Sequence, residues 1–455
     1  MLDKQHDKSP RISRIESFID SKDMVQNPIE VIEKYRRKLG PTFTFYFGGM
    51  RRTIISADPQ FIQHVLKDNQ ANYHKSDIQV ERMGEFQGQG LLNSHGDHWL
   101  KQRRFLSMGF RRSRLKELWP LQSEVLNQFM EHFTDKAEKQ PIDIREHMMK
   151  FTLRTVGKSL FGRSMQDKEL NELGEAISQI QAFIVRQIVQ PYKIPWFRIS
   201  GQTEQFQTKR READQIVRNY VQKRRQHGDR ELDLLQQIID TPYRDDAQYM
   251  DDEQTIVELL QLLVAGNETS SNTLSWAFYL LAKHPEHIVV MREEIETAFG
   301  TDEVSYEKIH ELSYVIGVLN EAMRLYPPFW MIDRVALGDD QVCDVKVTAG
   351  TTVVPYIYGV HKNENIWKDP DRFDPTRFLG KNKRHPFSHI PFGGGPRVCI
   401  GQNMAIMQML FVIVAIVRRY DFALNPIREV HKRAMMILRP DGPIKMSFFR
   451  AKKAS

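Results

Sequence analysis

The stretch Phe392-Gly393-Gly394-Gly395-Pro396-Arg397-Val398-Cys399-Ile400-Gly401 carries the clearest information in this sequence. Its three consecutive glycines allow a tight loop that can approach a flat ligand closely. Cys399 then stands at the start of an apolar segment that predicts a final helix from about Ile400 to Tyr420. A lone cysteine is more often an inert buried thiol. Here, however, the N–H groups and the dipole of a helix start would stabilise a thiolate. Gly401 leaves room for a bound ring, and Arg397 can pair with an anionic group on it.

A second informative segment is the longest predicted helix, which runs from Asp251 to His284 and is closed by Pro285. Its apolar character predicts a path through the core. Its centre, Ala265-Gly266-Asn267-Glu268-Thr269-Ser270, is a poor helix interior. In isolation, Glu268 would be a surface residue and Thr269 would bond back to its own helix. Between small residues in an apolar helix, the pair instead predicts a carboxylate and a hydroxyl that deliver protons.

The remaining pattern is mostly helical. It predicts helices over 209–227, 285–299 and 306–325, a β-hairpin over 42–55, strands over 347–357 and an irregular stretch over 366–391. Since no repeat or low-complexity linker interrupts the chain, we expect one domain over 1–455, mainly α with small β-sheets. Residues 1–20 are a candidate flexible segment.

Composition narrows the functional class. The chain has 455 residues, 41% hydrophobic and 27% charged, with a net charge of +7 and two cysteines, Cys343 and Cys399. Without a Lys/Arg tail, nucleic acid is not an expected partner. The charged N-terminus does not resemble a signal peptide. The longest apolar run, Met409 to Val417, is too short to span a bilayer. Sparse cysteines fit a reducing compartment, so we expect a soluble, cytoplasmic protein.

The loop resembles the haem-binding signature of the cytochrome P-450 superfamily at Phe392, Gly395, Arg397, Cys399 and Gly401. The resemblance implies that haem b lies between the core helix and the cysteine loop, with Cys399 as the thiolate ligand of the iron, donating electron density that favours O–O cleavage. It implies a monooxygenase that activates dioxygen. In it, Ala265 lies at the cofactor, Thr269 hydrogen-bonds the iron–oxygen species and Glu268 relays protons.

Other segments match further motifs of the same family. Trp99 and Arg103 resemble its Trp-x-x-x-Arg motif and, with Arg334, are implied to hold the haem propionates; His98 is expected to be only a polar neighbour. Glu321 and Arg324 match its Glu-x-x-Arg motif. The partner motif reads Pro375-Thr376-Arg377-Phe378, with Thr in place of the usual Glu, which leaves Arg377 as the expected third member of a structural ion network.

By position in the family, substrate contacts map onto 85–89, 183–190, 262–269, 329–332 and 434–438. The candidate contact residues are Gln87, Gln89, Arg186, Val264, Ile332 and Met436. This mixture of polar and apolar side chains slightly favours a methoxylated sugar, which would undergo oxidative O-demethylation. The alternative is that the glutamines face water and that the substrate is a fatty acid or a terpenoid.

The resemblance also implies electrons from NAD(P)H, supplied by a separate ferredoxin or flavodoxin and its reductase. Basic residues at Arg104, Arg111, Arg112 and in Lys381-Asn382-Lys383-Arg384 suggest a docking face for such a partner, or they serve solubility alone. Two other classes are alternatives, a peroxide-dependent haem enzyme and a non-catalytic haem sensor. Neither would need the Glu268–Thr269 pair.

Overall fold

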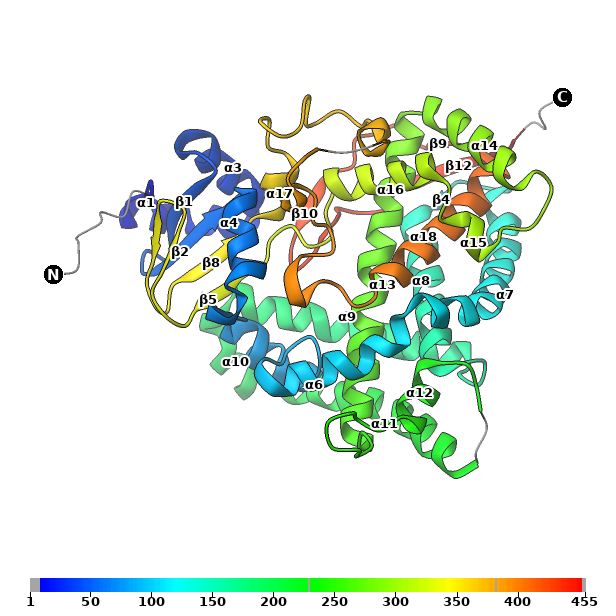
Figure 1. Ribbon diagram of the computed structural model, residues 1–455, viewed down its shortest axis with the longest axis horizontal. Coiled ribbons are helices and arrows are strands. Elements are labelled where there is room, and N and C mark those ends of the chain that lie inside the picture. Colours follow the sequence, from blue (N-terminus) through cyan, green and yellow to red (C-terminus); the bar gives the residue numbers. More distant parts are fainter. Residues whose placement is uncertain (1–8, 228–229, 381–382, 452–455) are drawn as a thin grey trace.

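The computed structural model describes residues 9–227, 230–380 and 383–451, which form a mainly helical fold with small sheets (Figure 1). This confirms the expected fold class. The longer helices are α3 (Pro28–Leu39), α6 (Gly96–Leu106), α7 (Arg112–Ala137), α8 (Ile144–Phe161), α9 (Asp167–Val189), α11 (Gln202–His227), α13 (Asp252–Lys283), α14 (Glu286–Phe299), α16 (Ser313–Leu325) and α18 (Gln402–Val417). The shorter helices are α1 (Arg14–Ile19), α2 (Ser21–Gln26), α4 (Pro59–Gln63), α5 (Gly84–Gln87), α10 (Ile194–Ile199), α12 (Leu234–Asp240), α15 (Tyr306–Ile309) and α17 (Ile357–His361).

The largest sheet lies on the N-terminal side of the molecule (Figure 1). It has five strands in the order β1-β2-β8-β5-β3, namely β1 (Thr42–Phe47), β2 (Arg51–Ser56), β8 (Thr352–Pro355), β5 (Arg334–Ala336) and β3 (Tyr73–His74). The predicted hairpin is its β1–β2 pair, in which Phe43 lies opposite Ile55. Strand β8 joins β2 in parallel and thereby connects the N-terminal hairpin to the chain that precedes the cysteine loop.

Three smaller sheets complete the β structure. One has the order β4-β12-β9, with β4 (Ile142–Asp143), β12 (Lys445–Arg450) and β9 (Tyr420–Leu424). The others are antiparallel pairs: β6 (Asp340–Val342) with β7 (Val345–Val347), and β10 (Lys432–Ala434) with β11 (Leu438–Pro440). The β10–β11 hairpin matters for the site, because its turn and β11 approach α13.

Helix α13 is the central element of the fold and agrees with its predicted bounds to within one residue at each end. The Asp251 carboxylate accepts the N–H of Gln254 and so caps the first turn. The helix ends at Lys283, because His284 precedes a proline and leaves helical geometry. Helices α8, α11, α16 and α18 pack around it. Its second half, Leu274 to Leu281, is buried throughout.

The two helices after α14 differ from the single helix predicted over 306–325. The chain forms α15 and α16, separated by His310, Glu311 and Leu312. Leu312 is buried in a non-helical conformation. The Glu294 carboxylate of α14 accepts the N–H groups of Tyr314 and Val315. A side chain from a neighbouring helix therefore starts α16, which no local pattern reveals.

The N-terminal segment also differs from expectation over its described part. Residues 14–19 form α1, and Ile12 and Ser17 are buried. The N–H of Ile12 donates to the carbonyl of Thr44, so this stretch is fixed to β1 and is not a free segment. Residues 1–8 of the predicted flexible segment lie outside the described residues. Among the described helices, none is long and apolar enough to cross a membrane.

Candidate active site

The cysteine loop is folded tightly against the end of an N-terminal helix. Gly395 opens the 3₁₀-helix η8 (Gly395–Arg397), and the N–H of Cys399 donates to the carbonyl of Phe392 over 2.9 Å. Gly395 has a φ of +69°, and a Cβ there would overlap the Leu66 carbonyl oxygen. Glycine is therefore required at this position both by conformation and by space. The loop delivers Cys399 just before α18 begins at Gln402.

The Cys399 thiol is desolvated by its surroundings and yet accessible on one side. One side of the Cys399 side chain is exposed. Protein surrounds its other sides, and this burial raises the pKa of the thiol. The backbone N–H of Gly401 and the charge of Arg103 act in the opposite direction and favour the thiolate. A cysteine enclosed by protein but open on one side is suited to bind a ligand there. At Gly401 an added Cβ would meet only Phe110, at 3.8 Å, so the protein itself leaves this side free.

Four cations gather beside this loop from four different elements. They are Lys75, Arg103 of α6, Arg334 of β5 and Arg397 of the loop. Desolvation lowers the pKa of Arg397 to about 10, with Arg334 and Arg103 adding repulsion. Desolvation likewise lowers the pKa of Lys75 to about 7, again with Arg334 and Arg397 contributing.

None of these four cations forms an ion pair with a carboxylate in the part of the chain that the structure describes. Lys75 and Arg397 donate to the carbonyls of Leu92 and Ser94. The Arg397 guanidinium also lies 4.1 Å from the centroid of the Trp99 ring. The charge of Asp333 offsets part of the repulsion at Lys75 and Arg334. An anionic ligand bound among these partly buried cations would offset the rest. The cluster therefore includes the three predicted arginines, and Lys75 is a member that sequence reasoning missed.

The centre of α13 presents a partly exposed stripe in an otherwise buried helix. Val264, Ala265, Glu268 and Thr269 are partly exposed, whereas Leu263 and Ser270 are buried. The Thr269 hydroxyl donates to the Ala265 carbonyl over 2.6 Å. Its oxygen keeps lone pairs that can accept a further hydrogen bond.

Glu268 faces a different neighbour from Thr269. Its carboxylate lies 4.0 Å from the guanidinium of Arg439 in β11. Desolvation raises the pKa of Glu268, while Arg439 and Arg145 oppose that shift. The pair predicted to work together thus lies on one helix, but the two side chains form no hydrogen bond with each other. A carboxyl group with a raised pKa exchanges protons closer to neutral pH.

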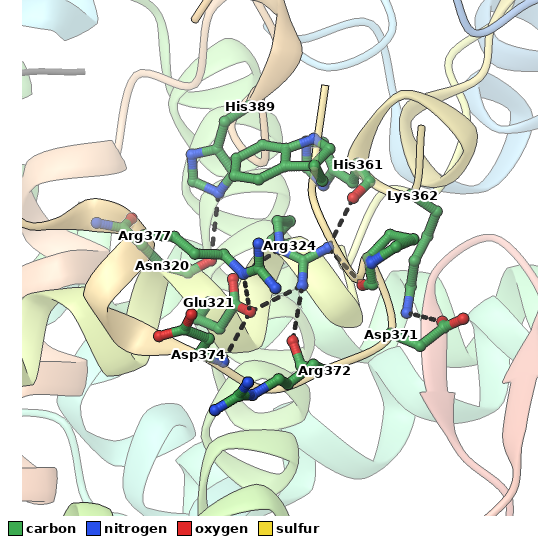
Figure 2. A network of polar contacts seen from close by, with 12 residues as sticks. Asn320, Glu321, Arg324, His361, Lys362, Asp371, Arg372, Asp374, Arg377 and His389 are labelled. Carbon is green, nitrogen blue, oxygen red and sulfur yellow. Dashed lines mark hydrogen bonds and ion pairs between the residues drawn. The ribbon is translucent and has the colours of Figure 1, made fainter. Parts of the chain in front are cut away.

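The side chains of Glu321, Arg324 and Arg377 meet in one polar network (Figure 2). Both Glu321 and Arg324 are fully buried, and their side chains form a bidentate pair at 2.6 and 2.7 Å. The guanidinium of Arg377 reaches Glu321 over 3.2 Å. The N–H of Asp374 also donates to Glu321, over 3.0 Å. Thr376, which replaces the usual Glu, donates its hydroxyl and its N–H to Asp374, and among the described residues it forms no hydrogen bond with Glu321, Arg324 or Arg377.

Three chain segments predicted to contact substrate meet in one apolar cluster. Phe86, Phe183 and Ile184 are buried together with Phe197 and Phe206, and Met436 of the β10–β11 turn packs against them. The predicted contacts Val264 and Ile332 lie in other clusters, beside α6 to α9 and beneath the large sheet respectively.

The polar residues predicted to contact substrate are mostly engaged within the protein. The buried Gln87 accepts a hydrogen bond from Asn93 over 3.3 Å. The exposed Gln89 donates its amide to the Val80 carbonyl. Arg186 is exposed and lies over the rings of Phe183 and Phe206, at 5.3 and 5.7 Å.

A backbone clamp, which sequence reasoning also missed, holds the loop 87–92 along α13. The buried side chains of Glu258 and Gln261 accept the N–H groups of Leu91 and Leu92 over 3.0 and 2.8 Å. The Gln261 amide donates to the carbonyl oxygens of Gln87 and Gly88. A Cβ at Gly90 would come within 2.7 Å of the Gln261 oxygen, so the loop backbone lies directly on the helix. The available signal was the pair of polar residues three apart in an apolar helix.

The basic residues proposed as a docking face differ in their surroundings. Arg104 lies 3.8 Å from Asp245, whereas Arg111 and Arg112 are exposed and lack an ion pair with any residue of the described ranges. Lys381 and Asn382 lie outside the described residues. His98 is exposed, and its ring is 3.2 Å from the Gln89 carbonyl, away from the cation cluster.

Comparison with known proteins gives matches along almost the whole chain. The family model described as "Cytochrome P450" matches residues 11–448. Similar proteins include the rice protein "Cytochrome P450 734A5", 27% identical over 446 residues that cover 92% of this chain and 81% of that protein. The "Putative cytochrome P450 132" of Mycobacterium bovis is 28% identical over 419 residues, covering 89% of both chains. The dog protein "Cytochrome P450 3A12" is 25% identical over 442 residues, covering 91% of this chain and 85% of its own.

Proposed function

Because this chain belongs to the cytochrome P450 family and is therefore a haem-thiolate monooxygenase, we propose that it hydroxylates a largely apolar small molecule, such as a fatty acid or a terpenoid. Haem b is its cofactor, dioxygen its oxidant and NAD(P)H the ultimate source of its electrons. When bound, haem supplies the activation of dioxygen and the insertion of one oxygen atom into a C–H bond. The observation that carries the substrate class is the apolar cluster formed by Phe86, Phe183 and Met436.

The residues of the site fit this cofactor. A haem carries two carboxylates, and the unpaired cations Lys75, Arg103, Arg334 and Arg397 are suited to hold them. The adjoining Cys399 thiol is open on one side, and the Gly401 N–H and the charge of Arg103 favour its thiolate against the larger effect of burial, which raises the pKa. In this proposal Cys399 is the iron ligand, Trp99 with Arg103, Arg334 and Arg397 anchors the propionates, and Phe392, Gly401 and Ala265 border the ring.

The proposed proton path uses two atoms of α13. Thr269 Oγ1 holds a proton that it shares with the Ala265 carbonyl, and its lone pairs can accept a proton-bearing water. Burial raises the pKa of the Glu268 carboxyl group, which brings its proton exchange closer to neutral pH. The guanidinium of Arg439 lies 4.0 Å from that carboxyl group, and in this proposal a rotation of the Glu268 side chain carries a proton toward Thr269.

One polar side chain within the apolar cluster supports a substrate with a single hydrogen-bonding group. Gln187 is 4% exposed on the same face of α9 as Phe183 and Ile184. Within the described ranges its amide forms no hydrogen bond, unlike that of Gln87, which is bonded to Asn93. An apolar chain or ring system bearing one hydroxyl or carboxyl group would match this environment.

O-demethylation of a methoxylated sugar, the activity slightly favoured by the sequence, loses its main support. It depended on Gln87 and Gln89 as hydrogen-bond partners of substrate hydroxyls, and both amides bond to the protein. A sugar needs several polar partners in a site that excludes water, and the cluster around Phe183 offers few.

Ligand titration, followed by the shift of the haem absorption band, tests the substrate class. We expect fatty acids or terpenoids to shift the band and methylated sugars to leave it unchanged. Gln187→Leu should weaken binding of a hydroxylated or carboxylated ligand about 5- to 150-fold. Gln89→Leu, the exposed control, should not. A clear shift with a methylated sugar that Gln87→Leu abolishes would contradict the proposal and restore the sugar.

For electron supply we propose a separate ferredoxin or flavodoxin with its reductase. The exposed Arg111 and Arg112 support an acidic partner, because complementary charge accelerates encounter. The rate of reduction by such a partner should fall with added salt. It should fall further in an Arg111→Gln, Arg112→Gln variant; a salt-independent rate would contradict docking at this face.

A further inference from the structure

A fully buried histidine connects the ion network to the cysteine loop. His361, drawn in Figure 2, ends α17. Its ring is fully buried, and its Nε2 accepts the N–H of Ile390 over 2.9 Å. Because Nε2 is the acceptor, the ring proton must be on Nδ1. Nδ1 is buried and forms no hydrogen bond with any of the described residues. The bond from the Ile390 N–H to Nε2 alone therefore fixes the tautomer and anchors the ring to Ile390.

The contacts on both sides of this ring form one continuous path. On one side, Arg324 donates to the His361 carbonyl over 2.8 Å while it pairs with Glu321. On the other side, Ile390 begins the cysteine loop, and its carbonyl accepts the N–H of Gly393 over 2.9 Å. Phe392 directly precedes Gly393 in the chain, and its carbonyl accepts the N–H of Cys399. The path therefore runs from the Glu321–Arg324 pair to the cysteine.

The groups around the ring keep it neutral and so able to accept. Arg324 and His389 both face it, and the two histidine rings lie 5.1 Å apart at 30°. Burial and these neighbours hold the pKa of His361 well below its ordinary value. Burial likewise lowers the pKa of His389 to about 3. A protonated His361 would lose its acceptor and turn a second donor toward the Ile390 N–H.

We propose that His361 is a positioning residue for Cys399. Through its bond to the Ile390 N–H it fixes where the cysteine loop starts, and it transmits the rigidity of the Glu321–Arg324 pair to the thiolate. This inference rests on the proposal above that Cys399 is the iron ligand. It goes beyond that proposal by giving the ion network a specific effect on the thiolate, where stability alone was expected.

Three substitutions of His361 in the haem-loaded enzyme test this role. His361→Gln can place its carbonyl near the position of Nε2 and keep the acceptor, whereas His361→Leu removes it. His361→Asn is polar but reaches only the position of Nδ1. The readout is the fraction of reduced, carbon monoxide-bound enzyme with the red-shifted band of a thiolate ligand. His389→Phe is the control, because the partly buried His389 ring lies 5.1 Å from that of His361 but bonds to the Asn320 carbonyl of α16.

We expect Leu and Asn to shift the equilibrium from the thiolate form toward a misligated form by about 5- to 150-fold, as one unpaired buried N–H predicts. Gln should restore the thiolate form, and His389→Phe should keep it. If Leu yields no folded enzyme, the Gln and Asn variants decide the matter. A normal band in every haem-loaded molecule of the Leu and Asn variants, or a Gln variant as impaired as Asn, overturns the role of His361. A wild-type enzyme without the red-shifted band would instead overturn Cys399 as the ligand.

Discussion

Glu258 allows a quantitative test of the clamp on the loop 87–92. Its side chain is completely buried, with one oxygen accepting the Leu91 N–H over 3.0 Å and the other accepting the Gln254 amide over 2.8 Å. Among the described residues no cation pairs with it. Desolvation therefore outweighs both hydrogen bonds and raises the pKa of Glu258 from 4.5 to about 7.

The direction of the pH effect follows from this shift. The folded protein binds the Glu258 proton more tightly than the unfolded chain does. Below about pH 4.5 the carboxyl group is protonated in both states and costs nothing; above about pH 7 it is ionised in both, and the folded state bears the full cost of burying the charge. A pKa difference from 4.5 to about 7 corresponds to roughly 3 kcal/mol.

The substitution Glu258→Gln removes the ionisation and keeps the shape. The glutamine side chain has one acceptor oxygen for two donors, the Leu91 N–H and the Gln254 amide. We therefore expect the substitution to lower the free energy of unfolding by about 1–3 kcal/mol at all pH values. The free energy of unfolding of Glu258→Gln relative to wild type should therefore rise by about 3 kcal/mol between about pH 4 and pH 8. Urea unfolding followed by circular dichroism at several pH values measures this difference.

Glu253→Gln is the control for this experiment. Glu253 lies on the same helix but is exposed, and its bond to Arg218 lowers its pKa, so its replacement should not reproduce the rise. A difference between wild type and Glu258→Gln that stays flat across the pH range would refute the reasoning. It would mean that Glu258 is hydrated in solution and that the clamp is looser than described.

Three further predictions concern the site directly. Cys399→His should retain haem but lose the red-shifted carbon monoxide band and the oxygenase activity, because a neutral imidazole donates less than a thiolate; a normal band would remove Cys399 as the ligand. Thr269→Ala should still consume NADH but divert its electrons to peroxide, and the product formed per NADH measures this loss. Thr273→Ala is the control and should stay coupled, because the Thr273 hydroxyl bonds back to the Thr269 carbonyl one turn along the helix. Gly395→Ala should destabilise the apoprotein, since its Cβ would overlap Leu66, while Gly401→Ala should spare the apoprotein and impair haem binding; equal melting temperatures for the two apoprotein variants would contradict this.

The local sequence pattern was sufficient to predict elements with a long apolar run or a fixed residue spacing. The core helix was predicted to within one residue at each end because its apolar run is long and Pro285 marks its end. The cysteine loop was predicted because its glycines and Cys399 have fixed spacing. The network of Glu321, Arg324 and Arg377 was predicted through a family resemblance, since in sequence terms alone the first two form an ordinary surface pair.

The residues that sequence reasoning missed depend on contacts between distant segments. Lys75 joins three arginines only because β3, β5, α6 and the cysteine loop meet in space. His361 precedes its partner Ile390 by 29 residues. A lone lysine or histidine has no periodicity to detect. The prediction that Gln89 contacts substrate rested on its segment alone, and the sequence does not reveal which way a polar side chain points.

The clamp on the loop 87–92 has a consequence for engineering this enzyme. Glu258 and Gln261 hold the loop by its backbone N–H and C=O groups, which every residue except proline possesses. The clamp therefore depends little on which side chain stands at an exposed position such as Gln89. Libraries randomised at Gln89, with Gly88 and Gly90 kept as glycine, should yield mostly folded enzymes. The loop can thus be diversified for new substrates while its attachment to the core helix is left intact.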